Sequence, residues 1–153
     1  MPHLDDIDRK LLRALQQDAS LSHAALAELV GASPASCWRR IKALEQAGVL
    51  DAQVRLVDPT KVGRGVSVML NVRVKSQAQT ERADLEAFLK ARPEILEVYS
   101  MSGEWDYLMR IVAEGVADYQ RFLMHQLLNH PNVAASASHF ALSQVKYTTA
   151  IPV

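Results

Sequence analysis

A connection of only two residues, Gly31 and Ala32, separates two predicted helices near the beginning of the chain. Ser22 is a good N-cap for the first of these helices, and Gly31 ends it. Ser33 is placed to cap the second helix, and Pro34 occupies its first position, where the missing N–H costs nothing and φ is already helical. So tight a glycine-containing connection is typical of a helix-turn-helix, which leaves the second helix exposed.

Another short helix precedes this pair. Asp5 and Asp6 supply an acidic start, and apolar residues then recur at steps of three and four, at Ile7, Leu11, Ala14 and Leu15. The beginning of the chain is therefore predicted to form three short helices in series.

The third helix has two different faces. Steps of 100° per residue place Cys37, Ile41 and Leu44 on one buried stripe. The opposite face carries small and basic residues, which suit close approach to a DNA duplex and contact with guanine edges or phosphates. The residues expected to contact DNA are Ser33, Ala35, Ser36, Trp38, Arg39, Arg40 and Lys42. An ordinary solvated helix remains the alternative when this helix is considered alone.

The overall charge requires any DNA site to be local. Seventeen basic and seventeen acidic side chains give no net charge, which excludes a chain that binds nucleic acid through a bulk positive field. The single cysteine, Cys37, cannot form an internal disulfide, so we expect a cytoplasmic protein. No apolar run approaches the roughly 20 residues that a membrane span needs, so no membrane partner is expected.

The residues after Gly48 predict a strand and then a second domain. Residues 49–56 alternate with period two and stop at Asp58 and Pro59, which predicts a strand that serves as a wing or a linker. Gly63 and Gly65 then provide a plausible hinge. We therefore expect a DNA-binding domain with its linker strand at residues 1–60, and an effector-binding and oligomerisation domain at residues 61–153.

The second domain shows a clear order of elements. Strand and helix patterns alternate as βαββαβ, with a turn at Ser102-Gly103-Glu104. The expected ranges are a strand at 66–75, a helix at 80–92, strands at 95–101 and 107–113, a helix at 116–129 and a last strand at 139–146. This order predicts a ferredoxin-like sandwich with both helices on one sheet face. The fold class is therefore α+β, a winged helix-turn-helix followed by a ferredoxin-like βαββαβ domain.

The other face of that sheet has no helix to cover it. Residues such as Met69 would be exposed to water in a monomer. Pairing with the sheet of a second copy is the simplest remedy, so we expect a homodimer.

Several motifs together resemble the Lrp/AsnC family of feast/famine transcriptional regulators. Residues 37–45 (CWRRIKALE), Gly48-Val49-Leu50 and Asp58-Pro59 are similar to the family's DNA-binding region. Residues 102–108 (SGEWDYL) look like its Gly-x-x-Asp-Tyr turn, and Val145-Lys146 with the following threonines looks like its closing strand. The resemblance spans nearly the whole chain. Cys37-Trp38 and the Lys-Tyr-Thr-Thr ending look like a branch linked to cysteine and other sulfur-containing or hydrophobic amino acids.

The resemblance implies a function and a set of partners. It implies dimers that bind double-stranded DNA and assemble into larger rings such as octamers, with an amino acid such as leucine, methionine or cysteine bound between sensor domains. Carried over by position, the effector residues would be Met101, Ser102, Gly103, Glu104 and Asp106, with Ser138, His139 and Phe140 approaching from another subunit. Asp106 or Glu104 could accept from the ammonium group, and backbone N–H groups around Gly103 could donate to the carboxylate. A purely structural turn is the alternative for this loop.

Two other classes of protein are alternatives to a transcriptional regulator. A ferredoxin-like enzyme is one, but the sequence lacks a nucleophile elbow and a phosphate-binding loop, and Cys37 lies on a buried stripe. Packing explains Cys37 better than catalysis, although neighbouring arginines leave a redox role open. His125 and His130 are five residues apart and face different ways, which argues against a shared metal. The other class is a sensor module without DNA binding. We expect no enzyme activity, no catalytic or metal residue and no cofactor.

Overall fold

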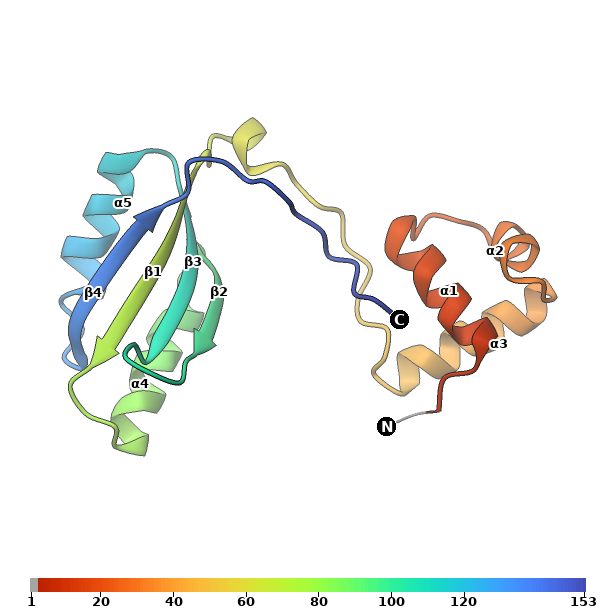
Figure 1. Cartoon of the computed structure of the whole chain (residues 1–153), viewed down its shortest axis with the longest axis horizontal. Coiled ribbons are helices and arrows are strands. Elements are labelled where there is room, and N and C mark those ends of the chain that lie inside the picture. Colours follow the sequence, from red (N-terminus) through yellow and green to blue (C-terminus); the bar gives the residue numbers. More distant parts are fainter. Residues whose placement is uncertain (1–2) are drawn as a thin grey trace. The chain divides into compact units, whose positions relative to one another are not determined.

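The computed structural model describes residues 3–153, which form two compact units (Figure 1). The first unit contains the described residues up to Arg55 together with Val145–Val153, and the second contains Leu56–Gln144. Hydrogen bonds hold the C-terminal segment in the first unit: Arg13 Nε donates to the Val153 carbonyl at 2.8 Å, and Ile151 N–H donates to Gln16 Oε1 at 2.7 Å. The sequence-based division at residue 60 assigned this segment to the second domain instead.

Three capped helices form most of the first unit, as the sequence predicts. They are α1 (Asp6–Gln17), α2 (His23–Val30) and α3 (Pro34–Gln46). The Ser22 hydroxyl accepts from Ala25 N–H and the Ser33 hydroxyl accepts from Ser36 N–H, both at 3.2 Å. Gly31 ends α2 with φ at 72°, a left-handed conformation that favours glycine. The helix-turn-helix is therefore confirmed.

The three helices enclose a small apolar core. The side chains buried there are Leu11, Leu26, Ala27, Val30 and Cys37. Cys37 is fully buried, as the helical spacing of α3 predicts. Its thiol therefore acts in packing and is not accessible from solvent.

An arginine ties α3 to the beginning of α1. Asp5 and Asp8 form a capping box at the start of α1, and Arg40 Nη1 lies 2.7 Å from a carboxylate oxygen of each. The backbone N–H of Asp8 lowers the pKa of the Asp5 carboxyl, and the Arg40 guanidinium lowers it further. One cation therefore joins two helices through the acidic cap that begins the fold.

The second unit is an antiparallel sheet covered on one face. Its strands are β1 (Val66–Val74), β2 (Ile95–Ser100), β3 (Tyr107–Ala113) and β4 (Val133–Phe140), in the spatial order β2-β3-β1-β4. The helices α4 (Gln79–Lys90) and α5 (Val116–Phe122) lie on the same face (Figure 1). This arrangement confirms the predicted βαββαβ topology.

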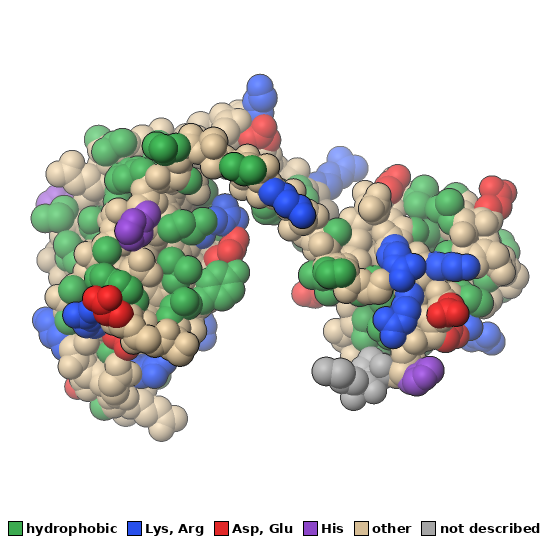
Figure 2. Space-filling model, in the orientation of Figure 1, with side chains coloured by type: hydrophobic (Ala, Val, Ile, Leu, Met, Phe, Trp, Pro, Cys, Tyr) green, Lys and Arg blue, Asp and Glu red, His purple; other side chains and the backbone are tan. Residues whose placement is uncertain are grey.

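The core of this unit lies between the sheet and its two helices. The central strand β1 contributes Val68, Leu70 and Val72, which are fully buried, while Met69 between them is 39% exposed on the opposite face. Figure 2 shows hydrophobic side chains gathered over that opposite face, which α4 and α5 leave uncovered. The alternation along β1 therefore produces one core face and one open face, as predicted.

Two predicted strands are wrong. Residues 51–57 are exposed and extended but pair with no other strand in the described part of the chain, so no wing strand forms. A period-two pattern cannot make a strand without a neighbour to satisfy its backbone groups. The last strand is Val133–Phe140 and not 139–146, because Phe140 pairs with Val68 close to the start of β1. Beyond Ala141, which donates to the Ser67 carbonyl, β1 offers no further partner.

The last predicted helix, 116–129, is interrupted. Regular α5 ends at Phe122, and Leu123–Leu127 form a π-helical turn, in which Leu128 N–H donates to the Leu123 carbonyl at 2.9 Å. Such turns are rare and often occur at functional sites.

Replacing Arg40 should loosen the first unit. We expect Arg40→Ala to lower the opening free energy of α1 and α3 amides by about 1 kcal/mol, measured by hydrogen exchange on the full chain near neutral pH. The pKa of Asp5 is lowered from 3.8. Its contribution is therefore present above pH 3.8 and is lost as the pH falls through the lowered pKa, so the difference between wild type and variant should shrink in acid.

Arg9→Ala is the matched control, because Arg9 is exposed on α1 and has no ion pair among the described residues. Equal protection of α1 and α3 in Arg40→Ala and Arg9→Ala would contradict the role of the Arg40 ion pairs.

Candidate DNA-binding surface and effector loop

The outward face of α3 presents an aromatic ring and two basic side chains to solvent. Trp38 is 52% exposed, and Arg39 is exposed and makes no hydrogen bond or ion pair among the described residues. Lys42 is also exposed and lies 2.7 Å from Glu45 Oε2, one helical turn further on. Arg39 is therefore the basic group on this face that is free to take a new partner.

The N-terminal end of α3 is also accessible. Ser33, Pro34 and Ala35 are exposed, and Ser36 is half-buried. The Ser33 hydroxyl is engaged in capping, so it fixes the start of the helix and leaves the small side chain of Ala35 at the surface. A helix start with small side chains can approach a phosphate closely.

Arg40 differs from the other residues proposed to contact DNA. Its guanidinium pairs with Asp5 and Asp8, and its side chain is only 26% exposed. The sequence places Arg40 beside Arg39 and gives both the same role, because the pairing depends on acids more than 30 residues earlier in the chain. The structure shows Arg40 as a half-buried residue whose guanidinium is engaged within the helical unit.

The predicted effector loop is the connection between β2 and β3. Met101 N–H donates to the Asp106 carbonyl at 2.8 Å and closes it. Gly103 has φ at 117°, which L side chains rarely adopt, so glycine is required at this position. Met101, Ser102, Gly103 and Glu104 are all exposed. The structure thus brings the predicted loop residues together in a rigid, accessible turn.

Arg73 of β1 supports the outer part of this loop. Its Nη2 lies 2.8 Å from Glu104 Oε1, and its Nε donates to the Glu104 carbonyl at 3.2 Å. Its guanidinium carbon is 5.0 Å from the centre of the Trp105 ring, a cation–π geometry. Glu104 therefore carries an exposed carboxylate held by one cation.

Asp106 anchors the inner part of the loop. Its Oδ2 accepts from Val74 N–H and its Oδ1 accepts from Gln77 Nε2, both at 2.7 Å. Both oxygens thus have partners within the chain, so the contacts of Asp106 are those of a structural anchor. Glu104, which is 73% exposed, is the loop carboxylate more available to an incoming ammonium group.

The predicted residues of the last strand face two directions. The Ser138 and Tyr119 hydroxyls are 2.5 Å apart, and the Phe140 ring meets Tyr119 edge to face at 5.3 Å, so both lie on the helix side. His139 pairs with Met69 and therefore lies on the open side. Among the described residues, no hydrogen bond or ion pair joins these three residues to the effector loop.

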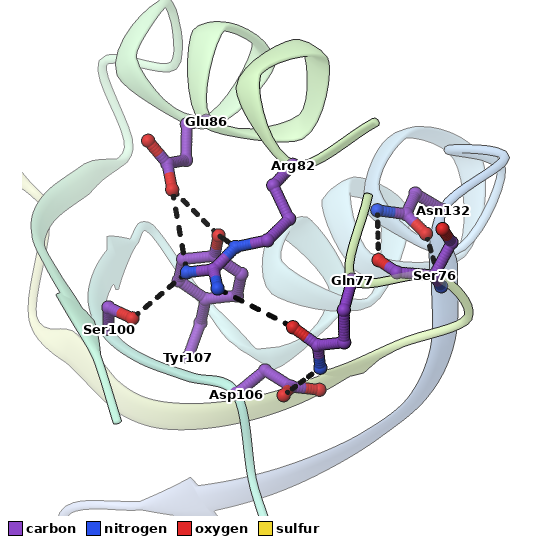
Figure 3. A network of polar contacts seen from close by, with 8 residues as sticks. All are labelled: Ser76, Gln77, Arg82, Glu86, Ser100, Asp106, Tyr107 and Asn132. Atoms are coloured by element: carbon purple, nitrogen blue, oxygen red, sulfur yellow. Dashed lines mark hydrogen bonds and ion pairs between the residues drawn. The ribbon is translucent and has the colours of Figure 1, made fainter. Parts of the chain in front are cut away.

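A polar network behind the loop was missed by the sequence analysis. Arg82 on α4 donates from Nε to Tyr107 Oη and from Nη2 to Ser100 Oγ, each at 3.2 Å (Figure 3). Its Nη1 donates to Gln77 Oε1 at 3.4 Å, and Gln77 in turn holds Asp106. One guanidinium thus joins α4 to the end of β2 and, through Gln77, to the effector loop.

Tyr107 is the buried centre of this network. Only 1% of the residue is exposed, and its hydroxyl donates to Glu86 Oε1 at 2.7 Å. Burial, and then the contact with Glu86, raises the pKa of the Tyr107 hydroxyl above its usual value of 10.0. The Gly-x-x-Asp-Tyr pattern pointed to Tyr107 and Asp106, but no sequence signal indicated that Arg82 and Glu86 complete their surroundings.

A second pair of contacts fixes the connection between β1 and α4. Ser76 N–H donates to Asn132 Oδ1 at 2.9 Å, and Asn132 Nδ2 donates to the Ser76 carbonyl at 3.2 Å (Figure 3). Asn132 is buried just before β4. The connection after β1, which also contains Gln77, is therefore fixed to the start of β4.

No membrane-crossing element or metal centre is found in residues 3–153. None of the helices there is long and apolar enough to cross a membrane. No group of three or more His, Cys, Asp and Glu side chains in the same residues could hold a metal ion.

A helix-turn-helix with an accessible recognition helix, linked to an antiparallel sandwich with a rigid glycine loop, defines a class of DNA-binding transcriptional regulators that carry a ligand-binding domain. The AsnC-type helix-turn-helix domain model matches residues 4–45, and the Lrp/AsnC ligand binding domain model matches residues 67–151. The chain belongs to the Lrp/AsnC family.

Relatives of similar length support this assignment. The DNA-binding transcriptional activator DecR of Escherichia coli K12 is 38% identical over 150 residues, which cover 98% of this chain and 99% of DecR. The glutamate uptake regulatory protein of Zymomonas mobilis is 34% identical over 149 residues, which cover 97% of this chain and 90% of that protein.

Solved structures show the same fold. An AsnC family regulator from Agrobacterium tumefaciens has a TM-score of 0.93 at 39% identity and covers 97% of both chains. A regulator from Neisseria meningitidis, in complex with L-methionine, has a TM-score of 0.94 at 33% identity and covers 98% of this chain and 97% of its own.

Removing the Tyr107 hydroxyl should weaken the support behind the loop. We expect Tyr107→Phe to lower the free energy of unfolding by about 1 kcal/mol, because Glu86 and Arg82 both lose a partner at a desolvated position. Urea unfolding of the full chain measures this change.

Tyr147→Phe is the matched control. Tyr147 is 54% exposed and its hydroxyl makes no hydrogen bond among the described residues, so a clearly smaller loss than in Tyr107→Phe is expected. Equal losses in the two variants would show that the hydrogen bonds of the buried Tyr107 hydroxyl carry no special weight.

Proposed function

We propose that this regulator binds double-stranded DNA as a homodimer through α3 and that a small amino acid bound at the loop 101–106 changes its DNA affinity or assembly. The proposal that α3 binds DNA rests on the different exposure of neighbouring residues on this helix. Arg39 and Trp38 face solvent, whereas Arg40 is held by two aspartates. Without Arg40, the residues proposed to contact DNA are Ser33, Ala35, Ser36, Trp38, Arg39 and Lys42.

The binding mode follows from the recognition helix. The N-terminal half of α3 would enter the major groove, where an arginine reads guanine edges or contacts phosphate. A homodimer predicts a palindromic site with half-sites one helical turn, or a multiple of it, apart. Because the chain has no net charge, affinity would come from this local surface and fall as salt increases.

The effector proposal combines the rigid loop with the family membership. Backbone N–H groups near Gly103 would donate to the ligand carboxylate, and Glu104 would accept from its ammonium group. Leucine, methionine and cysteine are the proposed effectors. Met101, Ser102 and Asp106 would complete the loop side of the site, with Ser138, His139 and Phe140 supplied by another subunit. The complex of the Neisseria regulator with L-methionine supports this class of ligand.

Assembly is proposed from the open sheet face. Met69 and Tyr99 are exposed on strands of the sheet that no helix covers on that side, and a second copy would shield such residues. We propose a dimer through this face and a higher ring, such as an octamer, as the resemblance implies. The protein would act in the cytoplasm as a regulator without enzyme activity.

Removing the free arginine should weaken DNA binding. We expect Arg39→Ala to lower affinity for the native operator and to reduce the dependence of log K on log salt by about one unit, since one phosphate or base contact is lost. Fluorescence anisotropy across a salt series measures both quantities, and sedimentation checks that the dimer is intact.

Lys90→Ala is the control for loss of one positive charge, because Lys90 is exposed on α4 in the other unit. It should leave operator affinity unchanged. Unchanged affinity in Arg39→Ala would contradict the proposed recognition face.

Neutralising Glu104 should uncouple the effector from DNA. In the wild type, methionine, leucine or cysteine should shift operator affinity by roughly 5- to 150-fold, the usual range of such coupling. Glu104→Gln should reduce that shift while basal DNA affinity stays the same.

Glu81→Gln is the control, because it neutralises an exposed glutamate on α4. It should retain the full effect of the amino acid on operator affinity. An undiminished response in Glu104→Gln would remove Glu104 from the proposed site.

A further inference from the structure

A cavity of about 490 Å³ lies at the end of the second unit opposite to the effector loop. The effector loop precedes Tyr107 at the start of β3, whereas the cavity is lined by Ile111, Val112 and Ala113 at the end of that strand. Residues of α5 and the following π-helical turn form its other side. Its volume is within the range of about 300–1,000 Å³ that is typical of small-molecule sites.

Two shielded acceptors in this cavity have no partner. Glu94 Oε2 and Gln126 Oε1 are buried and accept no hydrogen bond from the described residues. Both residues line the cavity, although one precedes β2 and the other lies in the π-helical turn about 30 residues later. Buried acceptors are normally paired, so two unpaired acceptors on residues that line one cavity point to a missing donor.

The other charges of the cavity are already neutralised. Asp118 lies 3.4 Å from Arg64 and 3.3 Å from Arg121, and Arg64 also lies 3.5 Å from Glu114. Among the lining carboxylates in the described part of the chain, Glu94 is the one without an ion pair. Arg64 and Arg121 are balanced by Asp118 and by Glu114 outside the lining, so the unpaired carboxylate is that of Glu94, and the group that fits beside it is a cation that donates hydrogen bonds.

The rest of the lining is apolar. Phe122 and Ile111 are almost fully buried, and Pro93 and Tyr119 extend this surface. We propose that this cavity is a second ligand site, which binds a small compound with a primary ammonium group and an apolar body. The ammonium group donates to Glu94 and Gln126, and the body packs against Phe122 and Ile111. This site is independent of the proposed effector loop.

Three probes that share a 3-methylbutyl group separate the head groups. L-leucine carries ammonium and carboxylate, 3-methylbutylamine carries only the amine, and 4-methylpentanoate carries only the acid. The readout is the δ1-methyl resonance of Ile111 in the full-length protein, with the Ile41 methyl of α3 as an internal reference. We expect 3-methylbutylamine to shift the Ile111 resonance with saturation, and 4-methylpentanoate to leave it unchanged.

Matched variants test the carboxylate directly. Glu94→Gln keeps the shape of the side chain and removes its charge, so the apparent Kd for 3-methylbutylamine should rise at least tenfold. Glu81→Gln removes an exposed charge on α4 and should leave that Kd unchanged. The proposal is overturned if Ile111 does not respond to the amine in the wild type, or if Glu94→Gln binds it as the wild type does. Equal weakening in Glu94→Gln and Glu81→Gln, which indicates unspecific attraction of a cation to the surface, overturns it as well.

The test of the cavity can be distinguished from the test of the proposed effector loop. Glu104→Gln, which addresses the effector loop, should leave the Ile111 response to 3-methylbutylamine unchanged. Loss of the amino acid effect on DNA affinity with an intact Ile111 response would count against the effector loop alone, and the reverse result would count against the cavity alone.

Discussion

The pairing of β1 on both of its edges is the constraint on which the second unit depends. The strand is bonded to β3 on one side and to β4 on the other, and its core-facing side chains are fully buried. One end of β1 carries Val74, whose N–H holds Asp106 and thereby the effector loop. The other end begins next to the wall of the Glu94 cavity, where Val66 pairs with Ala113. The central strand thus lies between the two proposed sites, and both adjoin the same packed core.

In the first unit, the neighbouring residues Arg39 and Arg40 have different surroundings. Arg40 neutralises the acidic capping box of α1 and fixes α3, and this leaves Arg39 and Trp38 on a helix face whose orientation is determined. A recognition helix needs such support, because contacts to base edges require the helix to be held firmly by its own domain. The same sequence motif therefore supplies both the structural arginine and the arginine that we propose to contact DNA.

The parts of the fold that local chemistry determines could be predicted from the sequence. Ser22, Ser33 and Pro34 act within one helical turn, and the helices begin where those residues indicate. The predictions were wrong where the structure of a segment depends on a partner that is distant in the sequence. Residues 49–56 alternate like a strand but find no neighbour, and β4 begins at Val133 because its register follows β1. For the same reason the pairing of Arg40 with Asp5 and Asp8, and of Arg82 with Tyr107, could not be seen in the sequence.

We propose that one chain combines DNA reading with amino acid sensing. Sedimentation of the full-length protein, on the DNA upstream of its own gene and with or without methionine, leucine or cysteine, measures both properties together. We expect protein–DNA complexes to form and at least one of these amino acids to change their sedimentation. Complexes that do not form, or that sediment identically with every amino acid, would contradict the combined role.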